Sequence, residues 1–216
     1  MRPWVLATRN PGKLRELQAL FAEYRIAVED LTDLGVTVDP HAEEGIEAFG
    51  TFEENALAKA RYFAGLLPGR LVVSDDSGLV VDALNGAPGV HSKRWCGRAD
   101  LHGRALDDAN NALLIDRLTD VSNRAARFVC AAAWCMDSGS GAVSGEVPGW
   151  IVDVSSGTNG FGYDAYFFVE ELGCTLADAT VDEKGTVSHR ARAFAGLIGV
   201  LRGGGDLDVR IIGTPG

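Results

Sequence analysis

The sequence lacks several features that would each assign it to a class of proteins. No hydrophobic run approaches the roughly 20 residues that a membrane-spanning helix needs, so we expect no membrane partner. Basic residues are few, since 20 lysines and arginines face 30 aspartates and glutamates, for a net charge of −10. A nucleic-acid-binding protein needs a broad basic surface, so nucleic acid is excluded as a partner. A phosphate-bearing ligand must therefore be held by a few placed cations and backbone N–H groups.

Cysteine is also scarce, and the spacing of the four cysteines matches no zinc-binding pattern. Cys130 and Cys135 lie in an apolar, strand-like stretch, and we expect both to be buried as small hydrophobic residues. The N-terminal residues enter a strand-like run at once, without the sections of a signal peptide. These absences predict a cytoplasmic protein whose cysteines bind no metal.

The composition is that of an ordinary globular protein, with 46% hydrophobic and 23% charged residues. Strand-like and helix-like stretches alternate, which predicts an α/β fold. Expected strands lie near 4–8, 26–29, 71–74, 127–136, 142–154 and 165–169, and expected helices near 14–24, 52–67, 102–118 and 188–202. The length suits a single domain over 1–216, built as one body or two packed lobes. We expect 203–216 to be a C-terminal tail or an edge strand.

The first candidate site joins the first strand to the first helix and consists of Thr8, Arg9, Asn10, Pro11, Gly12 and Lys13. Asn10 is a favourable N-cap and Pro11 suits the first helical position, so a well-capped helix is the simpler interpretation. Lys13, however, places a cation in the first turn, where it opposes the helix dipole. A glycine turn and a lysine at a helix N-terminus form an anion site, although the spacing is not that of a P-loop.

The second candidate site is the acidic pair Asp75 and Asp76, which follows an expected buried strand that ends at Ser74. Aspartate, serine and glycine are turn formers, so an acidic turn is one interpretation. The carboxyl end of a strand is also where ligands bind in α/β sheets. Mg²⁺ takes one or two carboxylates together with phosphate oxygens, and a further carboxylate can orient or deprotonate water. Both interpretations stay open at this point.

The third candidate site is the start of the last expected helix. Ser188 is a candidate N-cap, and His189 and Arg190 follow it in the first turn, with Lys184 close upstream. Cations in that position do not stabilise the helix. A solvated basic helix end would explain them singly, but two helices with the same defect favour a shared anionic or polar ligand.

Two further stretches fit the same picture. Asn55 and Lys59 are four residues apart and share a helix face, for which a surface hydrogen bond is the simpler interpretation. The segment 157–164 contains three glycines, which permit a tight loop with close backbone approach. Its aromatic residues, Phe161 and Tyr163, either stack on a base or pack into the core.

Together these stretches resemble the inosine triphosphate pyrophosphatase family. The segments that carry the resemblance are LATRNPGKLREL (6–17), TFEENALAKAR (51–61), SDDSGLVVDALNGAPGVHSKRW (74–95), GFGYDAYFF (160–168) and EKGTVSHRARA (183–193). They occur in the family's order and span most of the chain. The resemblance implies an elongated central mixed sheet flanked by helices, with two lobes around a substrate cleft. It also implies a homodimer that hydrolyses ITP, dITP and XTP to the monophosphate and pyrophosphate with Mg²⁺.

The resemblance also assigns roles to residues. Asp76 would be the catalytic carboxylate and a metal ligand, supported by Asp75, and Ser77 would touch the substrate. The stretch from Thr8 to Lys13 would bind the triphosphate, with Lys59 nearby. The nucleoside pocket would consist of Phe161, Gly162, Tyr163 and Asp164. The 6-oxo group of the base would be read by Lys184, His189 and Arg190.

Two departures from the family pattern stand out. Ala165 occupies the position where the family usually has proline after Gly–Tyr–Asp. The family's metal-linked glutamate corresponds by spacing to Glu47, with Glu43 and Glu44 as rivals. Two alternative functions also remain: a pyrophosphatase for other altered nucleotides, such as modified pyrimidines, and a nucleotide sensor without catalysis. The adjacent carboxylates argue against the sensor, because binding a triphosphate needs no extra negative charge unless a metal is present.

Overall fold

The computed structural model describes residues 2–39, 43 and 45–203. The chain divides into two compact units. Unit 1 consists of residues 1–76, 130–145 and 189–216, and unit 2 consists of residues 77–129 and 146–188. The predicted tail lies, from residue 204 onward, outside the described residues. No helix in the described part of the chain is long and apolar enough to cross a membrane.

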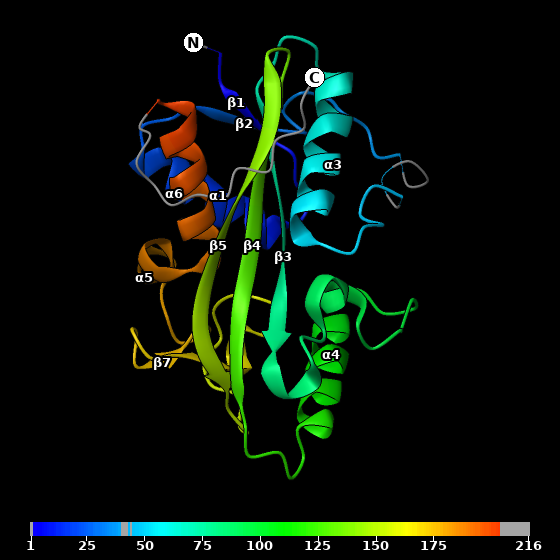
Figure 1. The fold of residues 1–216 in the computed structure, drawn as a ribbon, viewed down its shortest axis with the longest axis vertical. Coiled ribbons are helices and arrows are strands. Elements are labelled where there is room, and N and C mark those ends of the chain that lie inside the picture. Colours follow the sequence, from blue (N-terminus) through cyan, green and yellow to red (C-terminus); the bar gives the residue numbers. More distant parts are fainter. Residues whose placement is uncertain (1, 40–42, 44, 204–216) are drawn as a thin grey trace. The chain divides into compact units, whose positions relative to one another are not determined.

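Seven strands form one mixed sheet in the order β2-β1-β3-β4-β5-β6-β7 (Figure 1). Their bounds are Trp4–Leu6 (β1), Val28–Asp30 (β2), Val72–Val81 (β3), Ala125–Met136 (β4), Gly139–Ile151 (β5), Phe167–Val169 (β6) and Cys174–Thr175 (β7). β1 is parallel to both β2 and β3, whereas β5, β6 and β7 pair antiparallel. The predicted α/β class is therefore confirmed.

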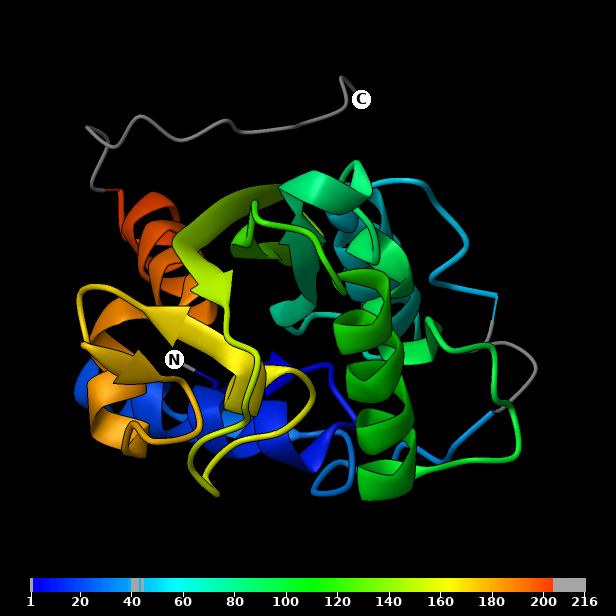
Figure 2. The same cartoon turned by 90° about the horizontal axis from the view of Figure 1, so that it is seen from below.

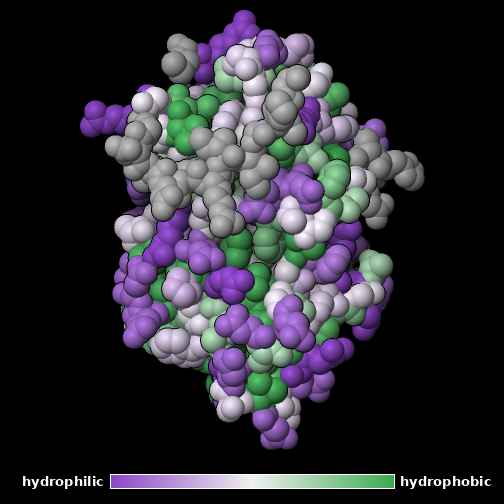
Figure 3. Space-filling view, in the orientation of Figure 1, coloured by the Kyte–Doolittle hydropathy of each residue, from purple (hydrophilic) through white to green (hydrophobic). Residues whose placement is uncertain are grey.

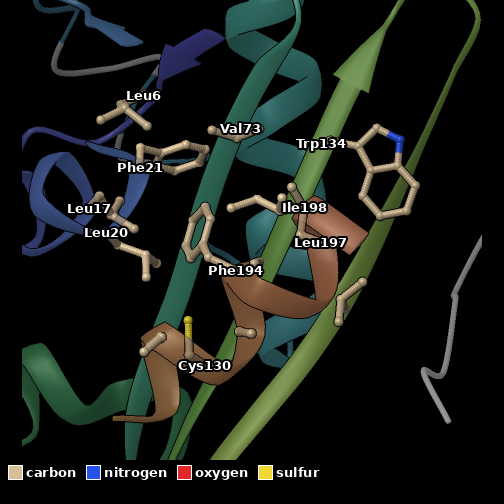
Figure 4. Close-up of a cluster of buried hydrophobic side chains, with 14 of the residues drawn as sticks. Leu6, Leu17, Leu20, Phe21, Val73, Cys130, Trp134, Phe194, Leu197 and Ile198 are labelled. Atoms are coloured by element: carbon tan, nitrogen blue, oxygen red, sulfur yellow. The ribbon is translucent and has the colours of Figure 1, made fainter. Parts of the chain in front are cut away.

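In unit 1, helices cover the two faces of the strands because side chains alternate along each strand. Leu6 and Val73 pack with α1 (Pro11–Glu23) and α6 (His189–Leu201), where the rings of Phe21 and Phe194 meet edge to face at 5.7 Å (Figure 4). Val5 belongs to a second cluster that contains residues of α3 (Phe52–Leu66). The helical periodicity in the sequence predicted these three helices at nearly the observed bounds.

Unit 2 has its own core between the strands and α4 (Gly103–Arg117), whose Leu114 is fully buried. The short strands β6 and β7 and helix α5 (Val181–Val187) belong to this unit (Figure 2). Trp150 and Phe168 are cross-strand partners on β5 and β6, and their rings stack at 4.6 Å. Cross-strand aromatic pairs of this kind help to fix strand register.

Several predictions about elements were wrong. The acidic pair does not end a strand, because β3 continues through Asp76 to Val81. Helix α5 and strand β7 were not predicted. Cys130 is buried as expected, but Cys135 is only partly buried. On the face shown in Figure 3, hydrophilic residues are interspersed with hydrophobic ones.

Candidate active site

The N-terminus of α1 is built as the sequence predicts. Asn10 is the N-cap, and its Oδ1 accepts hydrogen bonds from the backbone N–H groups of Gly12 (2.8 Å) and Lys13 (3.2 Å). Thr8 Oγ1 accepts from the Asn10 N–H at 3.2 Å and so fixes the entry to the helix. Pro11 is the first helical residue, and the first turn contains no acidic side chain. The positive end of the helix is therefore not neutralised by the helix itself.

Arg9 is held by a neighbouring loop. Its guanidinium donates to both carboxylate oxygens of Glu43, at 2.7 and 2.8 Å, and to the carbonyls of Val36 and Thr37. This bidentate pair is the strong form of the arginine–carboxylate contact, and it lowers the pKa of Glu43. Arg9 thus holds this loop in place through its side-chain hydrogen bonds. Glu43, a rival for the metal-linked glutamate, is already paired with Arg9.

Asp75 is the centre of a buried charge cluster in unit 1. Its side chain is fully buried, and its Oδ2 lies 2.9 Å from Lys13 Nζ and 3.3 Å from Arg190 Nε. Lys59 Nζ donates to the Asp75 backbone carbonyl at 2.8 Å. Burial by itself would raise the pKa of Asp75, but Lys13, Arg190 and Lys59 outweigh it and hold that pKa below its usual range.

One oxygen of this carboxylate stands apart from the cluster. Asp75 Oδ1 is buried and accepts no hydrogen bond from the described residues. Buried polar atoms nearly always have a partner, so this oxygen is an exception among the buried polar atoms of the cluster.

Asp76 lies in a different environment one residue further along β3. Burial raises the pKa of Asp76, and the nearby carboxylate of Glu47 raises it further, against the opposing effect of Lys13 and Lys59. Asn55 of α3 donates to Asp76 Oδ2 at 2.9 Å. Lys59, one turn further along α3, forms an ion pair with Glu47. Two adjacent aspartates of one strand therefore have pKa values displaced in opposite directions.

Arg190 is almost fully buried at the start of α6, and it pairs with Glu16 of α1 as well as with Asp75. These two carboxylates raise its pKa, against the effect of burial. His189 precedes it and is also buried. The guanidinium of Arg190 links α1, α6 and β3, and its expected role in reading the base stays a prediction. Ser188, which was expected to be the N-cap of the last helix, is the C-cap of α5.

The remaining predicted substrate residues lie in unit 2. Asp164 Oδ2 accepts from Lys184 Nζ at 2.8 Å and from the Phe161 N–H at 3.1 Å. Gly162, at φ +61°, is held on both sides by α4, because its N–H donates to Asp107 and its carbonyl accepts from Asn111, each at 2.9 Å. Ser77, the first residue of unit 2, is partly buried.

The two aromatic residues of this loop differ in exposure. Tyr163 is 4% exposed, belongs to the core of unit 2, and donates its hydroxyl to the Ser92 carbonyl at 2.8 Å. Core packing, one of the two interpretations left open by the sequence, therefore holds for this residue. Phe161 is only partly buried.

Sequence reasoning missed some residues of these clusters. Asn55 was expected to make a surface hydrogen bond, but it is 2% exposed and contacts Asp76. Glu16, Asp107 and Asn111 were not singled out at all. For Asn55, the sequence did offer one indication. Asn55 lies one turn before Lys59, on the helix face beside the apolar residues. For the other three, no local pattern distinguishes them from ordinary polar residues on a helix surface.

The fold and the cluster define an α/β protein in which three cations and an acidic pair converge beside a helix N-terminus. A family model described as the Ham1 family matches residues 4–200, so the chain belongs to this family. A relative from Exiguobacterium sp. named dITP/XTP pyrophosphatase is 45% identical over 194 residues, which cover 89% of this chain and 93% of the relative. A protein of the same name from Streptomyces coelicolor is 43% identical, with coverage of 92% and 96%.

Solved structures agree with these sequence matches. The Ham1 protein from Staphylococcus aureus superposes with a TM-score of 0.77 at 35% identity, covering 94% of this chain and 99% of that protein. A HAM1 protein from Coxiella burnetii gives the same TM-score at 34% identity. The predicted resemblance to nucleoside triphosphate pyrophosphatases is confirmed at the level of the family.

Proposed function

We propose that this protein hydrolyses ITP, dITP and XTP to the nucleoside monophosphate and pyrophosphate, with Mg²⁺. The names of the relatives support this substrate class. The observation that carries the proposal is the buried cluster of unit 1, in which Lys13 and Lys59 lie next to two aspartates of opposite pKa displacement. Pairs of titratable groups driven apart in this way are typical of acid–base chemistry.

The donor set of the cluster fits a magnesium ion. Mg²⁺ takes one or two protein carboxylates and completes its shell with water and substrate phosphates. Glu47 and Asp76 supply two carboxylates close enough to raise the pKa of Asp76, a repulsion that a divalent cation would relieve. When bound, the ion would neutralise charge on the phosphates and activate the α-phosphorus.

The chain's own residues account for the other requirements of the reaction. Lys13 and Lys59 hold phosphate oxygens at the positive end of α1. Asp76, whose raised pKa makes it a better proton acceptor, orients an attacking water and accepts its proton. The water oxygen forms a bond to the α-phosphorus as the bond to the bridging oxygen breaks, and pyrophosphate leaves with that electron pair.

We assign the reading of the base to Lys184, His189 and Arg190, as the resemblance implies. Lys184 is a cationic donor suited to the 6-oxo group of hypoxanthine and xanthine, whereas adenine presents an amino donor there. A buried donor left unpaired costs about 1–3 kcal/mol, so a few such contacts give strong discrimination. Because Arg190 is paired with two carboxylates, it also supports the charge cluster.

The test is pyrophosphate release from ITP, dITP, XTP, ATP and GTP, with Mg²⁺ and with EDTA. We expect rapid release from the first three only, and only with Mg²⁺. Faster turnover of dUTP or of methylated pyrimidine nucleotides than of ITP would replace the purine assignment. Asp76→Asn should abolish turnover, and an active Asp76→Asn variant would remove Asp76 from the catalytic role.

We also propose, from the resemblance alone, that the protein is a cytoplasmic homodimer. Light scattering coupled to size-exclusion chromatography measures the dimer directly. A mass near that of a single 22.9 kDa chain would contradict it.

A further inference from the structure

The side-chain amide of Asn55 makes three hydrogen bonds to two separate segments of the chain. It is 2% exposed on α3. Its Oδ1 accepts from the Phe49 N–H at 2.9 Å, and its Nδ2 donates to the Phe49 carbonyl at 3.3 Å and to Asp76 Oδ2 at 2.9 Å. One amide therefore ties the main chain of Phe49 to the side chain of Asp76.

The two ends of this link are significant because Phe49 lies two residues after Glu47. Glu47 and Asp76 are the two carboxylates that we assign to the metal, and they come from a loop and from β3. Lys59, one turn after Asn55 on the same helix, pairs with Glu47. Helix α3 thus contacts both carboxylate-bearing segments, through a neutral donor on one and a cation on the other.

We propose that Asn55 is a positioning residue that sets the separation and orientation of the Glu47–Asp76 metal-binding pair. The inference rests on the proposed function, because it concerns the metal of that reaction. Groups that orient metal ligands from behind typically change metal affinity or activity by about 10- to 100-fold when they are removed.

The chemistry of an asparagine side chain suits this role better than that of aspartate or leucine. An amide carries both an acceptor and two donors, so it can match a main-chain N–H and C=O while it also donates to a carboxylate. Aspartate at this position would face Asp76 with a like charge. Leucine has nearly the same shape but can make none of the three bonds. Asn55 also adds no charge, so it brings no further positive charge to the carboxylates that would bind a divalent cation.

A second buried asparagine offers a matched control. Asn110 of α4 is also 2% exposed, accepts from the Cys96 N–H at 2.9 Å, and donates to the Lys93 carbonyl at 3.1 Å. It ties a loop to a helix as Asn55 does, but neither of these two bonds reaches a carboxylate. Replacing either residue by leucine removes a buried main-chain link, so both variants should lose stability to a similar degree.

The experiment compares the wild type, Asn55→Leu and Asn110→Leu as full-length proteins. Mn²⁺ binding to the nucleotide-free protein is followed by electron paramagnetic resonance, and thermal unfolding identifies any variant that fails to fold. ITP turnover is then measured over a range of Mg²⁺ concentrations. We expect Asn55→Leu to weaken Mn²⁺ binding and to raise the half-saturating Mg²⁺ concentration by about 10-fold or more. Its kcat should fall, whereas its KM for ITP at saturating Mg²⁺ should change by less than about 3-fold because Lys13 is untouched.

Asn110→Leu should bind Mn²⁺ as the wild type does. The proposal is overturned if Asn55→Leu keeps the wild-type Mn²⁺ affinity, if both variants lose it equally, or if the wild type binds no Mn²⁺. Failure of the proposed function is a separate result, since it would appear as a wild type that binds Mn²⁺ and releases no pyrophosphate from ITP. If Asn55→Leu does not fold, Asn55→Ser, which is smaller and polar, takes its place in the same comparison.

Discussion

Lys13 is bound by a carboxylate that has no exposure to solvent. Its Nζ lies 2.9 Å from Asp75 Oδ2, and its own side chain is 14% exposed. A phosphate therefore meets a cation whose direction is already fixed by its partner. Fixing a charged group before the ligand arrives reduces the entropy lost on binding, which is one use for a buried acid at the centre of an anion site.

We predict that Lys13→Ala weakens binding of a non-hydrolysable ITP analogue by about 10- to 100-fold, the value of a hydrogen bond to a charged group. Binding of inosine, which has no phosphate, should change by less than about 2-fold. Isothermal titration calorimetry with both ligands measures the difference. Equal losses for the two ligands would show that Lys13 does not contact phosphate.

Tyr163 gives a prediction about pH. Burial raises the pKa of Tyr163 above its usual value near 10, so the folded protein retains this proton at pH values where the unfolded chain has lost it. The stability that Tyr163 contributes is fully present below about pH 10 and is lost as the pH rises beyond that. Tyr163→Phe should lower the free energy of unfolding at pH 8 by about 1 kcal/mol, because the bond to Ser92 is lost.

The stability difference between the wild type and Tyr163→Phe should narrow from pH 10 upward. Urea denaturation at a series of pH values tests this. Parallel pH profiles for the two proteins would show that the Tyr163 hydroxyl is not held as described.

For individual residues, sequence patterns located the charged side chains but not the groups with which they pair. Lys13 and the acidic pair stood out because a cation at a helix N-terminus and adjacent carboxylates both break local rules. The burial of Asn55 and Tyr163 could not be inferred in the same way. An asparagine on a helix or a tyrosine in a glycine-rich loop has the same local sequence whether the chain covers it or not.

The helices and strands of the fold differ in how far their own local sequence determines them. Helices α1 and α3 were predicted because apolar residues recur at helical spacing and, for α1, because Asn10 is a favourable N-cap. Strand β3 was cut short because aspartate, serine and glycine are turn formers. The strand continues because cations from other elements neutralise Asp75, and those cations are distant in sequence.

Helix α5 is a different case, because the sequence does contain a helix-capping pattern at its start. Thr180 and Glu183 form a reciprocal capping box, a pattern that can be read from sequence. The helix has only seven residues and contains Gly185, so its periodicity is too short to indicate a helix. The two residues of β7 give no readable alternation at all.

The loop before β6 gives a prediction for an element of unit 2. Gly157 has φ +80°, and a Cβ built there lies 2.1 Å from the main-chain carbon of Ala177. Gly162 has φ +61° but open space around its Cβ position. Gly162→Ala should therefore cost only the strain of a left-handed residue, about 1–2 kcal/mol.

Gly157→Ala adds a main-chain clash and should cost about 3–5 kcal/mol. Chemical denaturation of both variants measures the difference between their free energies of unfolding. A cost for Gly157→Ala that is no larger than the cost for Gly162→Ala would mean that the loop can move away from Ala177.

For the whole molecule, the notable feature is how often the chain passes from one unit to the other. Three strands cross the boundary within their own length: β3 after Asp76, β4 after Val129 and β5 after Gly145. Unit 1 is assembled from three separate segments and unit 2 from two. Neither unit can therefore be cut out as a continuous fragment.

We predict that thermal unfolding is a single cooperative transition, because a strand cannot lose its order in one unit without disturbing its continuation in the other. Calorimetry should give a van't Hoff enthalpy equal to the calorimetric enthalpy. Two resolved transitions would show that the units unfold independently despite the shared strands.

The charge cluster of unit 1 also bears on how quickly a ligand arrives. Lys13, Lys59 and Arg190 share the cluster with four carboxylates, those of Glu16, Glu47, Asp75 and Asp76, on a chain whose net charge is −10. This balance of charge repels a bare polyanion at long range, so added salt should speed its association rather than slow it. At low salt the protein would then capture its ligand more slowly than in an unsteered encounter, and depend on local fit after contact.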